Sequence, residues 1–424
     1  MYKKSEKLLE RALKSIPLGS QTFSKSLTQY PRGASPFFIE KGKGAKVWDV
    51  DGNEYIDFIN SLAAVTIGYC DKDIDRAVQN QMKNGITFSL PHMLEMEVAE
   101  KLIEIIPSAE KVRFAKNGTD ATTAAIRMAR AYTGKDHIAI CGYHGWQDWY
   151  IGSTSRDLGV PQDTKNLTHK FEYNNLSSLE NIFNLHDIAC VILEPMNIEF
   201  PEGNFLNKVK ELTHNNNAIL VFDETITGFR FSLGGAQEFF DVTPDLSTFG
   251  KGMANGYPLS AVVGSNEIMQ KAEDIFFSGT FAGETLSLAA ASKIIDKYKK
   301  AKVIEHISEI GNYLLKNLNQ LIEDKALNNI FFTSGHPSWS FLQTKEQERY
   351  SLLEIKTFFL QEMFKRGILT LGSHNISFSH SKEMVDHLIE VYEEVLPIIE
   401  KNLNNQTLLQ NIKGDILKPL FKIR

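Results

Sequence analysis

The chain is poor in cysteine: its 424 residues include only Cys70, Cys141 and Cys190, and no two of them form a Cys-x-x-Cys pair. An odd number of isolated cysteines argues against a disulfide framework. Reduced, buried thiols of this kind are typical of cytoplasmic proteins. We therefore expect a cytoplasmic location and no metal site.

The chain also lacks an excess of positive charge and any long apolar run. It has 46 lysines and arginines against 52 aspartates and glutamates, a net charge of −6, so no basic surface indicates a nucleic-acid partner. No stretch approaches the roughly 20 apolar residues of a membrane span. Residues 1–10 lack the apolar core of a signal peptide. We expect neither a nucleic-acid nor a membrane partner.

The length predicts more than one domain, because single hydrophobic cores stop growing near about 250–300 residues. Short apolar runs such as Ala189–Leu193 and Ile219–Phe222 alternate with helical patterns through the middle of the chain. This alternation predicts an α/β fold with a mostly parallel sheet and helices on both faces. We divide the chain into residues 1–72, 73–295 and 296–424, with the sheet in the middle segment.

Two parts of the middle segment carry reactive side chains. An apolar run ends in Asp223, which indicates a buried strand with a carboxylate at its C-terminal edge, where open α/β sheets bind ligands. Lys251 follows in a loop between two glycines. Alone, it would be more typical of a surface lysine, but a desolvated lysine has a lowered pKa and forms Schiff bases. An acid for the ring nitrogen and a lysine for the aldehyde are what pyridoxal 5'-phosphate requires.

A third part supplies a place for a phosphate. Gly118 and Thr119 precede a stretch over 122–131 with good helix formers and apolar residues at helical spacing. A Gly-Thr turn that opens a helix offers free N–H groups, a hydroxyl and the positive end of the helix dipole. Such turns are common, but together with Asp223 and Lys251 this one completes the phosphate, ring-nitrogen and aldehyde sites of one cofactor.

The chain resembles the class III aminotransferases, most closely the glutamate-1-semialdehyde aminomutase branch, over nearly its whole length. The motifs that carry the resemblance are Asn117-Gly-Thr-Asp-Ala-Thr122, Tyr143-His-Gly145, Glu194-Pro195, Asp223-Glu-Thr-Ile-Thr-Gly-Phe-Arg230, Lys251 and Gly279-Thr280.

The resemblance implies pyridoxal 5'-phosphate as cofactor and the fold type I architecture of the enzymes that use it. In that fold, the large domain would be 73–295, with a mostly parallel sheet of the seven-stranded type. A small α+β domain would be built from both termini. Residues 1–72 would supply its N-terminal part with a gate loop, and residues 296–424 would supply the rest.

The resemblance also implies roles for the residues nearest the reaction. Asp223 pairs with the protonated pyridine nitrogen. Lys251 forms the Schiff base and then moves the proton that interconverts aldimine and ketimine. Tyr143 stacks on the pyridine face, although a core tyrosine would give the same pattern. His144 orients the ring or its acid partner, and Glu194 holds the network around His144 or the substrate. Structural roles are the alternatives for both.

Asn117, Gly118 and Thr119 are implied to bind the cofactor phosphate. The family usually has serine at position 117, but an amide also donates hydrogen bonds. Thr225 stands where the family has valine, so it either packs on the second ring face or bonds near the cofactor's 3-oxygen. Thr280 matches a threonine that reaches the phosphate of the neighbouring subunit. A homodimer is therefore expected, with Thr280 contributed across the interface.

The chain departs from the aminomutase pattern around the substrate. Lys25 replaces an arginine that grips the substrate carboxylate, and lysine does not reproduce a bidentate arginine contact. An expected tryptophan is missing from residues 61–64, Tyr69 replaces a histidine, and His92 replaces a small hydroxyl residue. With Gln21, these changes predict a more hydrogen-bonding substrate lining, suited to a polyhydroxylated or phosphorylated carbonyl compound.

We expect an aminotransferase that moves an amino group from a donor, for which we expect glutamate, to a sugar-like or small carbonyl acceptor. Tyr143–Trp149 and Gly283–Ser287 also resemble aminotransferase-like proteins of bacterial surface-polysaccharide pathways. The main alternative is the aminomutase itself, an isomerase that needs no external donor. A third is a non-enzymatic binding protein, which the intact Lys251 and Asp223 argue against.

Overall fold

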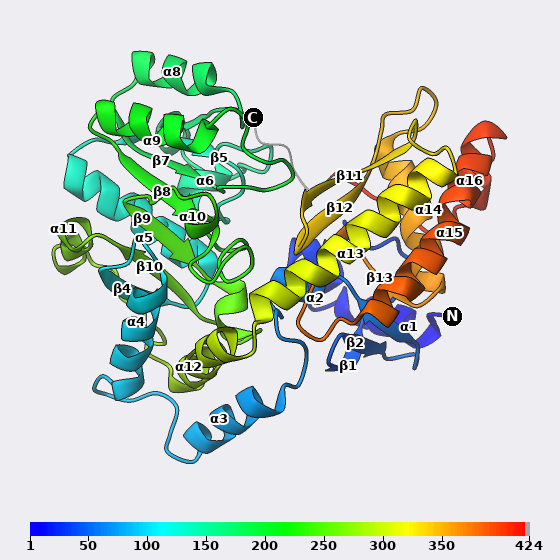
Figure 1. Ribbon diagram of the computed structural model, residues 1–424, viewed down its shortest axis with the longest axis horizontal. Helices are drawn as coiled ribbons and strands as arrows, with labels where there is room; N and C mark the ends of the chain where they lie inside the picture. The colour runs from blue at the N-terminus through cyan, green and yellow to red at the C-terminus, as the bar shows by residue number, and fades with distance from the viewer. Residues whose placement is uncertain (420–424) are drawn as a thin grey trace. The chain divides into compact units, whose positions relative to one another are not determined.

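The computed structural model describes residues 1–419. They divide into two compact units (Figure 1). One contains residues 1–62, 67–71 and the described residues from 305 onward, and the other contains 63–66 and 72–304. The end of the predicted segment 296–424, residues 420–424, lies outside the described residues. Within residues 1–419, no helix is both long and apolar enough to cross a membrane.

The unit formed mainly by residues 72–304 is built on a seven-stranded sheet. Only β10 runs against its neighbours, and the remaining strands are parallel to one another. The sheet is therefore mostly parallel, as predicted from the alternating pattern. In sheet order the strands are β4 (Lys111–Ala115), β10 (Ser260–Gly264), β9 (Leu246–Phe249), β8 (Ile219–Asp223), β7 (Ile188–Leu193), β5 (His137–Cys141) and β6 (Thr168–Lys170).

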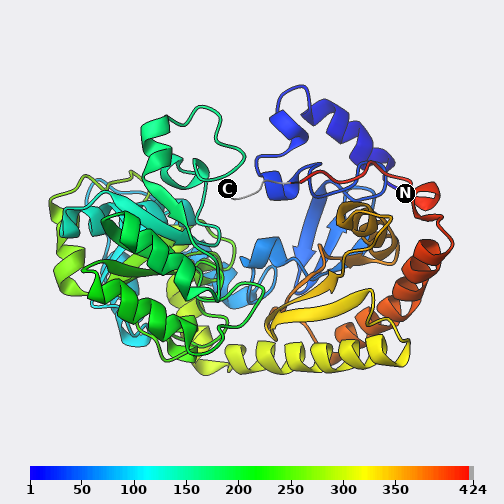
Figure 2. The same ribbon diagram turned by 90° about the horizontal axis from the view of Figure 1, so that it is seen from above.

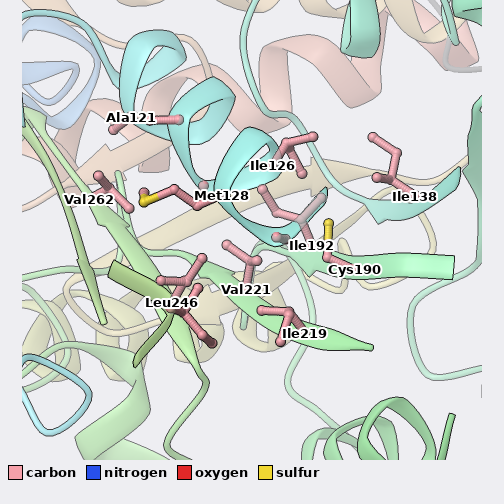
Figure 3. Packing of buried hydrophobic residues seen from close by; sticks show 14 of the residues in the cluster. Ala121, Ile126, Met128, Ile138, Cys190, Ile192, Ile219, Val221, Leu246 and Val262 are labelled. Carbon is pink, nitrogen blue, oxygen red and sulfur yellow. The ribbon is translucent and has the colours of Figure 1, made fainter. Parts of the chain in front are cut away.

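Both faces of this sheet are covered, which explains the unbroken apolar runs of its central strands. Side chains alternate between faces along a strand. In β7, Cys190 and Ile192 therefore pack with α5 (Gly118–Thr133) in one cluster (Figure 3), while Val191 and Leu193 pack in a second cluster. The second cluster includes residues of α8 (Leu176–Leu185) and α9 (Phe205–Asn215).

Further short and long helices complete this unit. They are α3 (Lys72–Met82), α4 (Met93–Ile105), α6 (Asp148–Ile151), α7 (Gln162–Asn166), α10 (Ala236–Phe239), η3 (Lys251–Ala254), α11 (Asn266–Met269), η4 (Gln270–Glu273) and α12 (Thr285–Lys300).

The other unit is assembled from both ends of the chain. β3 (Glu54–Asp57), near the N-terminus, pairs in parallel with β13 (Ile368–Leu369), more than half the chain away. Its sheets have the orders β1-β2-β3-β13 and β11-β12-β14. The other strands are β1 (Ile39–Lys43), β2 (Lys46–Asp49), β11 (Phe331–His336), β12 (Trp339–Thr344) and β14 (Ser373–Asn375).

Helices flank these sheets. α13 (Val303–Asp324) lies along the β11–β12 hairpin (Figure 2), and a Cβ at Gly311 would lie only 1.9 Å from the Pro337 carbonyl oxygen of its turn. Glycine is therefore required at this contact. The remaining helices are α1 (Lys3–Ala12), η1 (Pro17–Gly19), η2 (Phe23–Lys25), α2 (Asn60–Ala63), α14 (Leu352–Lys365), α15 (Lys382–Asn404) and α16 (Leu408–Asn411).

Candidate active site

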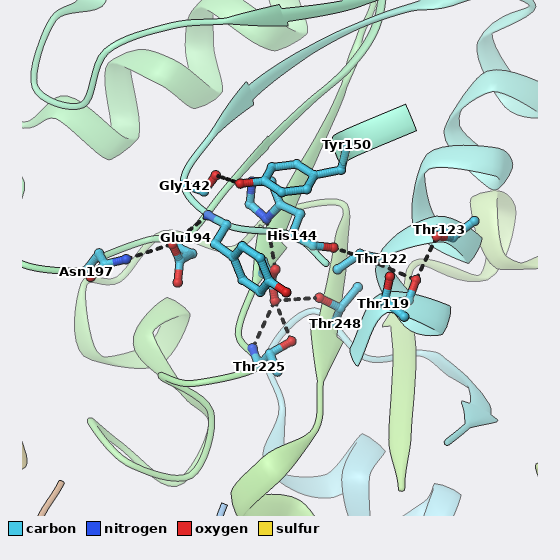
Figure 4. A network of polar contacts seen from close by, with 12 residues as sticks. Thr119, Thr122, Thr123, Gly142, His144, Tyr150, Glu194, Asn197, Thr225 and Thr248 are labelled. Atoms are coloured by element: carbon cyan, nitrogen blue, oxygen red, sulfur yellow. Dashed lines mark hydrogen bonds and ion pairs between the residues drawn. The ribbon is translucent and has the colours of Figure 1, made fainter. Parts of the chain in front are cut away.

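Three neighbouring parallel strands end at one edge of the seven-stranded sheet and place polar side chains there (Figure 4). Asp223 is the last residue of β8, Glu194 follows β7, and His144 follows β5. All three side chains are buried. Because parallel strands end at the same edge, residues far apart in the sequence meet here.

Asp223 and His144 form a buried pair. His144 Nδ1 lies 2.9 Å from Asp223 Oδ2. The other ring nitrogen, Nε2, is buried and has no hydrogen-bond partner among the described residues. A buried polar nitrogen without a partner is uncommon in folded proteins. An unpaired buried nitrogen of this kind is one sign of a functional site.

The second oxygen of Asp223 accepts three more hydrogen bonds. The Thr225 hydroxyl donates at 2.5 Å, the Thr225 N–H at 3.1 Å, and the Thr248 hydroxyl at 3.1 Å. Burial alone would raise the pKa of Asp223, but the hydrogen bond and charge of His144, together with Thr225, lower it. Asp223 therefore stays ionised and can hold a proton on a ring nitrogen placed against it.

Glu194 is held by the loop after β5. Its Oε2 accepts the Tyr143 N–H at 2.9 Å and the Asn197 amide at 2.8 Å. Gly142 has φ +105°, and a Cβ there would lie 2.5 Å from Glu194 Oε2, so glycine allows this close approach. Burial and the nearby charge of Asp223 raise the pKa of Glu194. Glu194 thus differs from Asp223 in its ease of ionisation.

Tyr143 presents an aromatic ring beside this carboxylate pair. Its side chain is 49% exposed, and the ring packs edge-on against Tyr150 with centroids 5.5 Å apart. Burial of the hydroxyl and the charges of Asp223 and Glu194 raise the pKa of Tyr143. An exposed ring near a buried acid is suited to stacking on a planar heteroaromatic ligand.

Lys251 begins η3, directly after β9 and Gly250. Its backbone has φ +42°, a left-handed conformation that costs a residue with a side chain about 1–3 kcal/mol. Burial lowers the pKa of Lys251 to about 8, although the charges of Glu194 and Asp223 oppose the shift. An amine with this pKa is partly uncharged near neutral pH, as Schiff-base formation requires.

The predicted phosphate turn opens α5. Asp120 accepts the Asn117 N–H at 2.8 Å, while the first turn of any helix leaves further N–H groups without acceptors inside the helix. The Thr119 hydroxyl accepts the Trp146 N–H at 3.3 Å. A Cβ on Gly118 would lie 3.0 Å from the Thr225 methyl group, so this turn contacts the loop after Asp223.

These features together fit pyridoxal 5'-phosphate. An ionised buried acid, a partnerless imidazole nitrogen and an exposed aromatic ring suit its pyridine ring. The helix start suits its phosphate, and the amine of Lys251 suits its aldehyde. Thr225 lies between the phosphate turn and the lysine turn, since a Cβ on Gly250 would also contact its methyl group, at 3.4 Å.

Thr280 lies apart from this cluster, exposed in the segment between η4 and α12. Its role in the phosphate site of a neighbouring subunit stays a prediction.

Three of the four predicted substrate residues, Gln21, Lys25 and Tyr69, belong to the unit built from both termini. Gln21 is exposed. The Tyr69 hydroxyl donates to Asp57 Oδ2 at 2.7 Å, and Lys25 Nζ donates to Ser61 Oγ at 3.4 Å. Burial raises the pKa of Asp57, while the hydrogen bond from Tyr69 and the charge of Lys25 oppose that rise.

His92, the fourth predicted substrate residue, caps the start of α4. Its Nδ1 accepts the Leu94 N–H at 3.2 Å, and its own N–H donates to Glu95 at 3.0 Å. The ring also stacks on Phe88, with centroids 5.4 Å apart. These contacts give His92 a structural role, and its contact with substrate stays a prediction.

Sequence reasoning missed Thr248, which donates to Asp223. It pairs with Asp223 across β8 and β9, and that register cannot be read from either strand alone. Arg230 ends one of the motifs, and the resemblance implies no role for it. It is fully buried, with its pKa lowered to about 10 by burial, and its charge contributes to lowering the pKa of Lys251.

Comparisons with known proteins agree on one family. The family model for class-III aminotransferases matches residues 29–396. The chain is 36% identical to a 3-aminobutyryl-CoA aminotransferase of Cloacimonas acidaminovorans, covering 94% of this chain and 98% of that protein. It is 34% identical to a glutamate-1-semialdehyde 2,1-aminomutase of Methanothrix thermoacetophila, with coverages of 92% and 95%. A solved structure of the FumI protein from a Sphingopyxis species, in its PLP internal aldimine form, is 26% identical with a TM-score of 0.87, covering 95% and 98%.

Proposed function

The chain belongs to the class III aminotransferases, and we propose that it moves an amino group between two substrates rather than within one. The comparisons confirm four predictions: the family, the fold type I architecture, aminotransferase activity as the enzyme class, and pyridoxal 5'-phosphate as cofactor. Since relatives of both kinds, transaminases and aminomutases, lie within the family, the choice between them depends on this chain's own residues.

The proposed roles of the site residues follow from their contacts. When bound, the cofactor supplies an aldehyde carbon for the amine and a ring that accepts negative charge from the reacting carbon. Asp223 holds a proton on the ring nitrogen, and His144 and Thr225 keep Asp223 ionised. The Lys251 amine would act as the base that takes the proton from the substrate carbon bearing the amino group. Gly118 and Thr119 bind the phosphate through the start of α5.

The observation that carries the proposal is the setting of Lys25. It stands where the aminomutases have the arginine that grips a carboxylate, and its amine is bonded to Ser61 beside the buried Asp57. A lysine carries a point charge and does not reproduce the bidentate contact of an arginine, so this position is poorly suited to gripping a substrate carboxylate. This supports a sugar-like or small carbonyl acceptor with glutamate as donor, as in surface-polysaccharide pathways.

We also propose a homodimer. Thr280 is flanked by the exposed apolar side chains of Phe276 and Phe281, which are 82% and 60% exposed. Leu90 and Met93 are 79% and 63% exposed on a second segment. The Thr285 N–H donates to the Ile86 carbonyl at 2.9 Å, which joins the two segments. An apolar surface of this kind marks an interaction site, and it supports Thr280 reaching a partner's phosphate.

A donor experiment tests the choice between the two reactions. Holoenzyme mixed with glutamate alone should release one equivalent of 2-oxoglutarate, and a carbonyl acceptor should then allow repeated turnover. Glutamate-1-semialdehyde supplied without any donor should react poorly. Rapid isomerisation of that compound without a donor would restore the aminomutase alternative.

A further inference from the structure

Three histidines meet at the sheet edge opposite the active site. His137 is the first residue of β5, His169 lies in β6, and His186 is the residue directly after α8. β5 continues to Cys141 before the chain reaches Tyr143, and four residue steps of strand span roughly 13 Å. The three imidazoles are therefore separate from the residues proposed to bind the cofactor.

The strand register brings these rings together. β5 lies between β6 and β7, and Ala139 of β5 is paired with His169 of β6. His137 is two residues before Ala139, so it projects from the same face of the sheet as His169. On the other side, His137 is paired with Ile188 of β7, two residues after His186. Backbone pairing therefore fixes where His137 and His169 lie, and the turn before β7 brings His186 beside them.

The ring nitrogens are close enough to share one ion. His137 Nδ1 lies 2.9 Å from His169 Nε2, and one nitrogen from each of the three rings lies within 4.8 Å of the others. A tetrahedral ion with bonds of about 2.0–2.1 Å holds its nitrogen ligands roughly 3.4 Å apart. The three side chains are partly buried, and His169 and His186, now stacked, would have to rotate apart for their in-plane nitrogens to point at one ion.

A simpler explanation is that the rings only stack and share a hydrogen bond. His169 and His186 are stacked with centroids 3.8 Å apart, and one proton lies between His137 and His169. That explains the stacking but uses only one of the three lone pairs that three neutral imidazoles offer.

We propose that His137, His169 and His186 form a binding site for a divalent transition-metal ion of the zinc and nickel class. Imidazole nitrogen suits these ions, whereas magnesium and calcium prefer oxygen. Binding would require the histidine that donates in the 2.9 Å contact to move its proton to its other nitrogen. Three protein ligands leave a fourth position for water. The ion would tie the short edge strand β6 to β5 and to the turn before β7.

Zinc titration of the holoenzyme tests this site, with affinity measured by competition against a chromophoric chelator. His169→Ala and His186→Ala each remove one ligand, and each should weaken zinc binding by about 100-fold or more. His214→Gln is the matched control, because His214 lies in the same unit but pairs with Asp245 at 2.9 Å instead. A Cys70→Ser background removes the one exposed thiol among the described residues as a competing ligand.

Cobalt(II) absorbance gives a second measurement, since a site with three nitrogens should give a visible spectrum that both alanine variants lose. Circular dichroism and transaminase activity, measured without metal, verify that the alanine variants are folded. Because activity is measured separately from metal binding, failure of the metal site is distinguishable from failure of the proposed function. Equal zinc affinity in wild type, His169→Ala and His186→Ala would overturn it. So would the absence of zinc, nickel and cobalt binding up to about 1 mM metal.

Discussion

Replacing Asp223 with asparagine should separate catalysis from folding at this site. The carboxylate accepts hydrogen bonds from His144 Nδ1, the Thr225 N–H and hydroxyl, and the Thr248 hydroxyl. Asparagine has the same shape but no charge, so it cannot hold a proton on the ring nitrogen. Losing a preorganised electrostatic contact of this kind raises the barrier by about 3–4 kcal/mol. We therefore expect kcat to fall about 100- to 1000-fold.

The fold and the phosphate contacts should survive this change. The donors around Asp223 can still bond to an amide oxygen, so the expected loss of unfolding free energy is about 1–3 kcal/mol. Glu224→Gln is a matched control at the next position. Glu224 is also buried, but it accepts the N–H groups of Ala236 and Gln237 at 2.7 and 2.8 Å, away from Asp223.

The assay is a single-turnover reaction of each holoenzyme with glutamate, followed by the cofactor's absorbance, alongside thermal unfolding. Asp223→Asn should bind cofactor but react slowly, whereas Glu224→Gln should react at a rate close to wild type and unfold at a lower temperature. If Asp223→Asn kept its cofactor and reacted within a few-fold of wild type, the acid would be structural and its proposed role in holding the ring-nitrogen proton would be wrong.

Three further predictions concern Lys251, Thr280 and Lys25. Because burial lowers the pKa of Lys251 to about 8, the rate at which the apoenzyme captures pyridoxal 5'-phosphate as a Schiff base should rise with pH through about 8, as the amine loses its proton. Borohydride reduction with peptide mapping should place a pyridoxyl group on Lys251, and a label on another lysine would refute the assignment. Thr280→Val should weaken cofactor binding while sedimentation still shows a dimer; a fully active monomer at nanomolar concentration would contradict the shared site. Lys25→Arg should raise kcat/KM for glutamate-1-semialdehyde by about 10-fold or more, since a bidentate carboxylate contact contributes about 2–5 kcal/mol. An unchanged value would show that position 25 does not contact that substrate.

The sheet and the acid at its edge could be predicted because one short segment of the sequence, the apolar run ending in Asp223, indicates both. The strand before Asp223 is apolar on both faces, and a strand that is buried on both sides of a parallel sheet must read this way. The end of such a run is also the edge where ligands bind. The apolar run that ends at Asp223 therefore predicted both a central parallel strand and the edge of the sheet where the ligand binds.

Contacts that depend on register or on side-chain competition could not be predicted. Thr248 reaches Asp223 because β9 aligns with β8 at that residue, and His137 meets His169 because β5 aligns with β6. Neither strand register can be predicted from the spacing of residues along the chain. His92 shows a different difficulty. A histidine in place of the family's small hydroxyl residue suggested substrate contact, and nothing in the sequence indicated that its ring nitrogen also caps α4.

The parallel pairing of β3 with β13 has a consequence for synthesis on the ribosome. The partner of β3 emerges only after some 300 further residues, which takes roughly 15–60 seconds at ordinary elongation rates. During that interval Tyr55 and Ile56, buried in the finished protein, belong to an open strand edge. The chain between them and β13 contains a whole sheet that can fold first. We expect nascent chains stalled before residue 368 to depend on chaperones that shield such edges.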